Sequence, residues 1–91
     1  MIRSFLHKGL RDLWGTGDHS GMNRRQVERI LRRLDALNAA TRPEDMDMPG
    51  FRFHRLHGVP TRWAVAVNGP WRITFAWDGT DAVLVDLEQY H

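Results

Sequence analysis

The chain has 91 residues, of which 42% are hydrophobic and 26% are charged, and its formal net charge at pH 7 is +2. This length leaves room for one hydrophobic core, so we predict a single folded domain over residues 1–91 and exclude a repeat array or a disordered chain. The absence of cysteine excludes disulfides, thiolate zinc sites and a thiol nucleophile.

No stretch approaches the roughly 18 consecutive apolar residues of a membrane span, and the first five residues lack the apolar core of a signal peptide. We therefore expect a cytoplasmic protein without a membrane partner. Lys8 is the only lysine, beside twelve arginines. Because guanidinium groups bind phosphate bidentately, this excess permits a polyanion partner, although the codon bias of a GC-rich genome would produce the same excess.

Helical patterns fill the first half of the chain, after a short first strand expected over residues 2–5. The spacing of leucines predicts a helix over His7–Trp14, which Gly15-Thr16-Gly17 ends. A longer helix is predicted over Arg24–Leu37, where Asn23 and Gln26 have the spacing of a capping box.

The longer helix is amphipathic. Its apolar stripe, which is expected to pack on a sheet, consists of Val27, Ile30, Leu31, Leu34 and Leu37. Its other face carries four arginines, Arg25, Arg29, Arg32 and Arg33. Such a face is either a solvated surface or a docking surface for RNA or an acidic partner.

The second half of the chain is typical of an antiparallel sheet, after a helical turn for which Thr41 and Glu44 have capping-box spacing. The predicted strands are Phe51–Leu56, Arg62–Val67, Trp71–Trp77 and Ala82–Glu88. The segments between them are short and contain glycine, which favours hairpins. We predict an α+β fold in which two N-terminal helices pack on one face of a small antiparallel sheet.

Alternation assigns the strand side chains to two faces. The expected core face consists of Phe51, Phe53, Trp63, Val65, Val67, Trp71, Ile73, Phe75, Trp77, Val83, Val85 and Leu87. The other face carries Arg52, His54, Ala64, Ala66, Arg72, Thr74, Asp86 and Glu88. Nothing in the sequence is left to cover this second face, so we expect the functional site there.

Among the five histidines, His54 is the one that alternation places beside arginines. An imidazole next to guanidinium groups suits proton transfer at a phosphate, because imidazole titrates near neutral pH and arginine neutralises developing charge. His7 and His19 are interpreted as surface or capping residues. No metal site is predicted, since His54, His57 and His91 lack the spacing of a ligand pair.

Four segments carry a family resemblance: residues 1–10 (MIRSFLHKGL), 41–46 (TRPEDM), 68–75 (NGPWRITF) and the terminal Tyr90-His91. In the same order and over nearly the whole chain, they closely resemble the HigB-type toxins of bacterial toxin–antitoxin pairs, within the RelE/ParE superfamily. The resemblance implies a RelE-like fold and a ribosome-dependent endonuclease that cuts messenger RNA codons in the ribosomal A site. It also implies a helix-turn-helix antitoxin as inhibitor, and operator DNA as a partner of the toxin–antitoxin complex.

The implied reaction needs no metal or other cofactor: the ribose 2′-hydroxyl attacks the adjacent phosphate and leaves a 2′,3′-cyclic phosphate and a 5′-hydroxyl. The resemblance assigns catalysis to His54, Arg72, Tyr90 and His91. The two histidines would share acid–base duty, the arginine would stabilise the phosphate, and the tyrosine would orient substrate or assist proton transfer. Arg52 is expected at the same phosphate, and the four helix arginines at ribosomal RNA.

Gln89 stands where the family has an aspartate, so a role that needs a charge at this position is in doubt and reduced activity is expected. Two alternatives stay open. One is a ParE-like inhibitor of DNA gyrase on the same scaffold, and the other is a degenerate toxin that binds only antitoxin and operator DNA.

Overall fold

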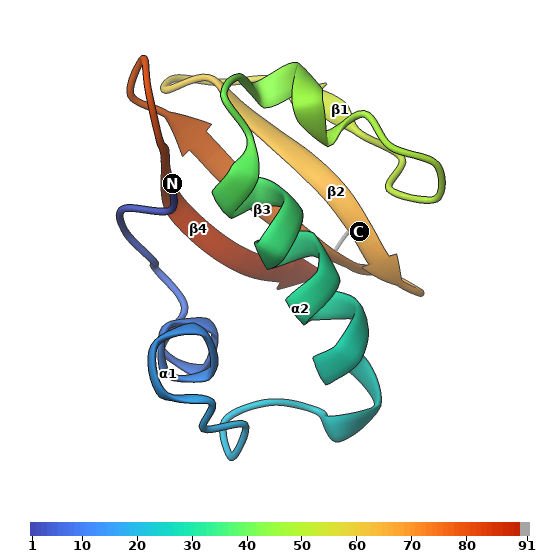
Figure 1. Cartoon of the computed structure of the whole chain (residues 1–91). Coiled ribbons are helices and arrows are strands. Elements are labelled where there is room, and N and C mark those ends of the chain that lie inside the picture. The colour runs from blue at the N-terminus through green and yellow to red at the C-terminus, as the bar shows by residue number, and fades with distance from the viewer. Residues whose placement is uncertain (90–91) are drawn as a thin grey trace.

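The computed structural model describes residues 1–89 as a four-stranded antiparallel sheet with helices on one face. The elements are α1 (Lys8–Thr16), α2 (Arg24–Ala39), the 3₁₀ helix η1 (Pro43–Met46), β1 (His54–Leu56), β2 (Arg62–Asn68), β3 (Trp71–Trp77) and β4 (Ala82–Gln89). The strands follow one another across the sheet in chain order, and α2 crosses one face (Figure 1). The predicted α+β class and the hairpin connections are therefore confirmed.

Helix α2 begins at Arg24 as predicted, whereas α1 begins at Lys8, one residue after the predicted start, and includes Gly15 and Thr16. Nδ1 of His7 accepts a 3.1 Å hydrogen bond from the Leu10 amide at the start of α1, which confirms the capping role of this histidine. Oδ1 of Asn23 accepts from the Arg25 amide at 3.0 Å in the same way. The expected reciprocal bond of Gln26 is wrong, because its Nε2 donates instead to Asn68 Oδ1, 2.8 Å away on β2.

The core lies between the helices and the sheet. Ile30, Leu34 and Leu37 of α2 are completely buried, as is Leu10 of α1. From the sheet they meet the buried side chains Val65, Val67, Ile73, Phe75 and Val85. The predicted apolar stripe of the longer helix is thus confirmed, with Val27 and Leu31 half-buried at its margin. No helix within residues 1–89 combines the length and the apolar character that crossing a bilayer requires.

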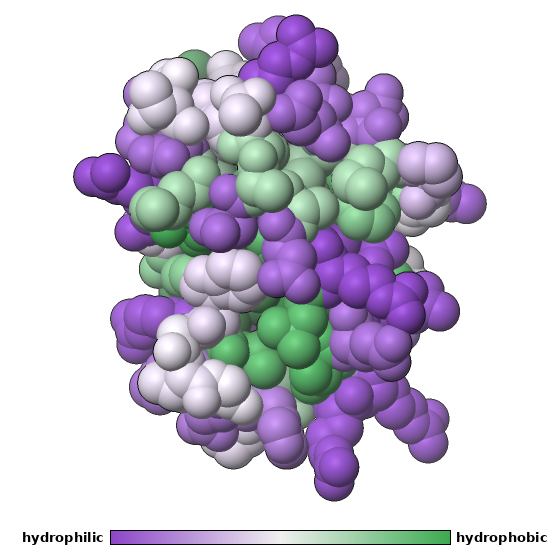
Figure 2. Space-filling model, viewed as in Figure 1, coloured by the Kyte–Doolittle hydropathy of each residue, from purple (hydrophilic) through white to green (hydrophobic). Residues whose placement is uncertain are grey.

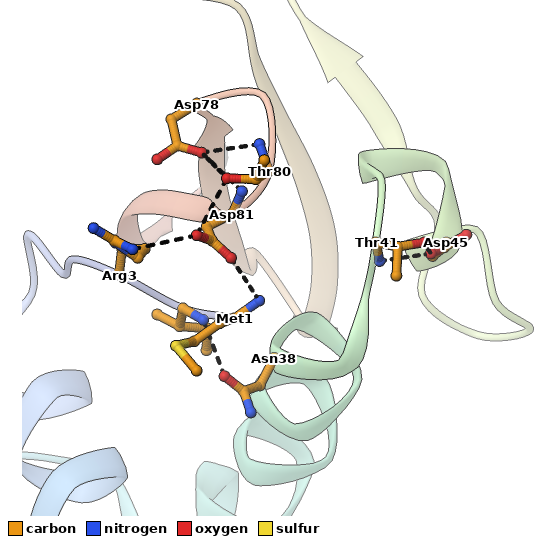
Figure 3. A network of polar contacts seen from close by, with 9 residues as sticks. Met1, Arg3, Asn38, Thr41, Asp45, Asp78, Thr80 and Asp81 are labelled. Atoms are coloured by element: carbon orange, nitrogen blue, oxygen red, sulfur yellow. Dashed lines mark hydrogen bonds and ion pairs between the residues drawn. The ribbon is translucent and has the colours of Figure 1, made fainter.

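The N-terminal segment runs parallel to β4 without forming a regular strand. Ile2 and Phe5 form isolated bridges to Ala82 and Val85, and the Arg3 and Leu6 amides donate to those same two residues at 2.8 Å. The segment is also held by its first residues: the Met1 amino group pairs with Asp81 at 3.1 Å, and the Ile2 amide donates to Asn38 Oδ1 at 3.0 Å (Figure 3). The outer edge of β4 is therefore covered by the chain itself.

A bulge in β4 changes which side chains face the core. Leu84 has a positive φ of 54°, and the pairing with β3 shifts register between Thr74 and Ala76. Ala82 and Val85, three positions apart, are consequently both fully buried in the core cluster. The prediction that Val83 faces the core is wrong, because strict alternation fails across the bulge.

The turn before η1 is stabilised by a different residue from the one predicted. The amide and hydroxyl of Thr41 donate to Asp45 Oδ2 at 2.8 and 3.1 Å, so Asp45 replaces Glu44 as the partner (Figure 3). These hydrogen bonds hold the pKa of the Asp45 carboxyl below its usual value.

Candidate active site

A cavity of about 270 Å³ lies where the start of β1 meets the β2–β3 hairpin. It is lined by Arg52, His54, Ala66, Gly69, Pro70, Trp71 and Arg72. The structure therefore brings together three residues that the sequence assigns to one site, Arg52, His54 and Arg72. An imidazole and two guanidinium groups around one cavity provide a proton acceptor and two phosphate-binding groups.

His54 is oriented by its neighbour. Its Nδ1 lies 3.0 Å from the carbonyl oxygen of Arg52. Because a carbonyl oxygen can only accept, this hydrogen bond requires the proton on Nδ1, which leaves the lone pair of a neutral ring on Nε2. The local geometry therefore prepares Nε2 of His54 to accept a proton.

Arg52 reaches the cavity by an irregular backbone. Its φ is +50°, in the left-handed region that disfavours side-chain-bearing residues, and the strand begins only at His54. The predicted strand from Phe51 is thus three residues too long at its start. Arg52 and His54 line one cavity, as predicted. They come together because of the left-handed backbone at residue 52, and regular strand alternation is not the cause.

Arg72 lies in the middle of the sheet beside a carboxylate. In the register of the strands it is opposite Ala66 on β2 and Glu88 on β4. Glu88 Oε2 accepts from Thr74 Oγ1 and, at 2.9 Å, from Nη1 of Arg62. Partial burial raises the pKa of Glu88, but the hydrogen bonds from Thr74 and Arg62, with the positive charges of Arg62 and Arg72, outweigh it and leave this pKa lowered.

The polar side chains of Arg62, Thr74 and Glu88 cover part of the sheet face that we expected to be open. Ala64 and Thr74 are 0% exposed, and Ala76 is 3% exposed. The expectation that nothing covers this face is therefore wrong. The long side chain of Arg62 lies along the sheet and approaches both Thr74 and Glu88, at 3.5 and 2.9 Å. The cavity at the hairpin is one accessible part of this face, and the side chains of Arg62 and Glu88 stay about one third exposed beside it.

The four helix arginines have different surroundings. Arg25 is exposed, and Arg32 is exposed with an ion pair to Glu28 at 2.7 Å. Arg29 is exposed too, yet its Nη1 lies 3.4 Å from the carbonyl oxygen of Val67. Arg33 is only 7% exposed, so its predicted place on the solvent or RNA-facing side is wrong. Its guanidinium group lies 4.5 Å over the Phe51 ring, on the core side of the helix.

The outer side of α2 has a second cavity, of about 300 Å³. It is lined by His19, Arg24, Val27, Glu28 and Leu31. Figure 2 shows an apolar area over α2 with hydrophilic side chains around it. No residue of this second cavity is shared with the first, so it is a separate surface feature.

Several expectations fall outside the cavity or outside the described residues. His57 is exposed directly after β1 and lines a separate cavity with Arg55, Leu56 and Gly58, while Gln89 is the exposed last residue of β4. Tyr90 and His91 lie outside residues 1–89. Within that range, no three His, Asp or Glu side chains come together as metal ligands.

Sequence reasoning missed the cavity walls. Gly69, Pro70 and Trp71 line the cavity from the hairpin, and the tryptophan was expected on the core face. The Asn-Gly-Pro sequence predicted a turn and gave no sign that the turn would form one side of a site.

Comparison with known proteins identifies the family. The model of a family described as "RelE-like toxin of type II toxin-antitoxin system HigB" matches residues 3–91. The chain belongs to this toxin family. A protein from Proteus vulgaris named Endoribonuclease HigB is 38% identical to the toxin over 92 residues, which cover 100% of both chains. The resemblance found in the sequence is confirmed by both comparisons.

Proposed function

We propose that this toxin is an endoribonuclease that cuts messenger RNA, and that the reacting phosphate binds in the cavity of His54, Arg52 and Arg72. One observation carries the proposal: a histidine whose Nδ1 is held by a carbonyl oxygen shares a small cavity with two arginines. The name of the Proteus vulgaris relative, Endoribonuclease HigB, supports RNA as the substrate.

In the proposed reaction, Nε2 of His54 takes the proton from a ribose 2′-hydroxyl. The 2′-oxygen attacks the adjacent phosphorus, and the bond from phosphorus to the 5′-oxygen of the next nucleotide breaks. The leaving oxygen receives a proton, and the products are a 2′,3′-cyclic phosphate and a 5′-hydroxyl. Arg52 and Arg72 neutralise the charge that develops on the phosphate oxygens.

The family resemblance adds His91 and Tyr90 to the catalytic residues. With His54 as the proposed base, His91 would be the acid that donates a proton to the leaving oxygen, and Tyr90 would orient the substrate or assist proton transfer. Because the chain itself contributes few reactive groups around the cavity, the ribosome would hold the message in the reactive geometry. Arg25, Arg29 and Arg32 are exposed and would contact ribosomal RNA phosphates.

The proposal includes partners and a compartment. Because the proposed substrate is translated messenger RNA, the toxin would act in the cytoplasm. A helix-turn-helix antitoxin would neutralise it, and their complex would bind operator DNA. The family description names a toxin–antitoxin system, which supports an antitoxin partner.

The experiment incubates a translated message with ribosomes and the purified toxin, and maps the new RNA ends. Cuts within translated codons are expected, with 5′-hydroxyl and 2′,3′-cyclic phosphate ends. His54→Ala and Arg72→Ala should each lower the cleavage rate about 10²- to 10⁴-fold. His19→Ala and Arg11→Ala remove the same side chains at exposed positions away from the cavity and serve as matched controls.

An intact message would contradict the proposal. Intact RNA together with DNA damage in expressing cells would favour gyrase inhibition, and intact RNA with retained antitoxin binding would indicate a degenerate toxin. Undiminished cleavage by both alanine variants would refute the assignment of the cavity.

A further inference from the structure

A buried arginine lies directly behind the cavity, on the core side of the sheet. Nε of Arg33 donates to the Ala66 carbonyl oxygen at 2.6 Å, and its guanidinium carbon is 4.5 Å from the Phe51 ring centroid. Nη1 donates at 3.1 Å to the carbonyl oxygen of Arg29, one turn earlier in α2. Within residues 1–89, the partners of this cation are therefore two carbonyl groups and an aromatic ring.

Arg33 is one of three residues by which α2 holds the end of β2. Gln26 bonds to Asn68 at 2.8 Å, Arg29 to Val67 at 3.4 Å, and Arg33 to Ala66 at 2.6 Å. Successive turns of the helix thus bind successive residues of the strand. The end of β2 leads directly into the hairpin that forms one side of the cavity.

The same contact reaches the other side of the cavity through the backbone. The Ala66 amide donates to the Phe51 carbonyl oxygen at 2.6 Å, so Ala66 and Phe51 are joined to each other as well as to Arg33. Phe51 is 8% exposed and is followed by Arg52, whose backbone is left-handed. The carbonyl group of Arg52 in turn holds Nδ1 of His54.

Burying the guanidinium group of Arg33 carries a desolvation penalty that a purely structural role would not require. Burial lowers its pKa, and the nearby charges of Arg29 and Arg32 lower it further. Within residues 1–89, no carboxylate forms an ion pair with it. A well-packed apolar side chain avoids such a desolvation penalty, so stability alone does not explain a cation here.

We propose that Arg33 is a positioning residue for His54. By holding Phe51 and Ala66 from the core side, it keeps Arg52 in its left-handed conformation, and the Arg52 carbonyl group keeps the His54 proton on Nδ1. The inference rests on the proposed role of His54 as proton acceptor, but its effect on the histidine can be measured without any cleavage.

The test uses three variants of the full chain. Arg33→Lys keeps a charge and an apolar stem but lacks the planar Nε donor. Phe51→Leu keeps an apolar residue and removes the ring. Arg11→Met is the matched control, an exposed arginine on α1 that lines neither cavity. Nitrogen NMR of the imidazole, at a pH where the ring is neutral, reports which nitrogen of His54 carries the proton.

In the wild type and Arg11→Met, the His54 proton should lie on Nδ1. In Arg33→Lys and Phe51→Leu, the two tautomers should interconvert, and cleavage on ribosomes should fall about 10- to 100-fold at a substrate concentration that saturates the enzyme. An unchanged Nδ1 proton in both folded variants would overturn the inference. Global unfolding of Arg33→Lys would also overturn it, because Arg33 would then be required for the core as a whole.

The two proposals fail separately. If the wild type does not cleave RNA but His54 loses its fixed proton in the variants, the proposed function fails and the positioning role stands. If the wild type cleaves and the variants keep both the fixed proton and the rate, only the positioning role fails.

Discussion

Arg52 combines a side chain that faces the cavity with a backbone conformation that glycine adopts far more readily. Its φ of +50° costs an L-residue about 1–2 kcal/mol, and glycine at the same position avoids that cost. We therefore predict that Arg52→Gly makes the protein more stable and less active. Arg52→Ala should lose the same activity and keep the backbone strain.

The expected size follows from two opposing effects. Glycine relieves the left-handed strain but loses about 0.4–1 kcal/mol, because it gives the unfolded chain more freedom. The free energy of unfolding of the glycine variant should therefore be higher than that of the alanine variant by about 0.5–1 kcal/mol. For a domain of this size, that difference raises Tm by about 3–6 °C. Both variants lack the guanidinium group that we propose binds the phosphate, so both should cleave about 100-fold more slowly or worse.

Thermal unfolding followed by circular dichroism measures the stability difference, and ribosome-dependent cleavage measures the activity. Arg55→Gly and Arg55→Ala form the matched pair, since Arg55 is an exposed residue of β1 without a positive φ. There the order should reverse, with glycine the less stable. Equal stability of the two variants at position 52 would show that the backbone of Arg52 is not strained. Full activity of Arg52→Gly would refute the proposed contact between its guanidinium group and the phosphate.

Two further predictions concern stability. A Cβ added at Gly9 would lie 2.8 Å from the Gly21 carbonyl oxygen, whereas nothing lies within 4 Å of one added at Gly15. Gly9→Ala should therefore lower the free energy of unfolding by about 1–2 kcal/mol. Gly15→Ala, in the same helix and measured by the same assay, should raise it by about 0.5–1 kcal/mol. A stabilised Gly9→Ala variant would disprove the close contact. The lowered pKa of Glu88 means that its charge stabilises the fold above its unfolded-state pKa and that this contribution is lost as the pH falls through the folded-state value. Glu88→Gln should lower the free energy of unfolding by about 1 kcal/mol at pH 7. It should also weaken the loss of stability as the pH falls below about 4.5 in urea titrations, and parallel curves for both proteins would contradict this.

The hairpin half of the chain could be predicted well from sequence because its signals are local. Glycine-containing turns and alternating apolar residues placed β3 at Trp71–Trp77, as found. Alternation failed where the backbone is irregular. The bulge at Leu84 turned Val83 away from the core, and after the left-handed Arg52 the first strand begins only at His54, three residues later than predicted. Neither feature has a glycine to mark it.

Arg33 shows a different limit of sequence reasoning. It follows Ile30 by three positions and precedes Leu37 by four, so the helical period already places it at the margin of the buried face. Its charge outweighed that signal in our interpretation. The sequence pattern predicted that His54, Arg52 and Arg72 share one face. The walls of the site, formed by the β2–β3 hairpin and by Arg33 behind it, depend on contacts between distant segments, which the pattern does not show.

The pairing of the first residues with β4 has a kinetic consequence. The Leu84 amide donates to Ser4 Oγ across 80 positions of the chain, whereas each sheet hairpin closes over a few residues. Loops that long cost more entropy to close, so the sheet can form from its hairpins before the N-terminal segment docks. Undocking of this segment alone would release the Arg3 and Leu6 amides and expose the β4 edge, while His54, Arg52 and Arg72 at the hairpin keep their places.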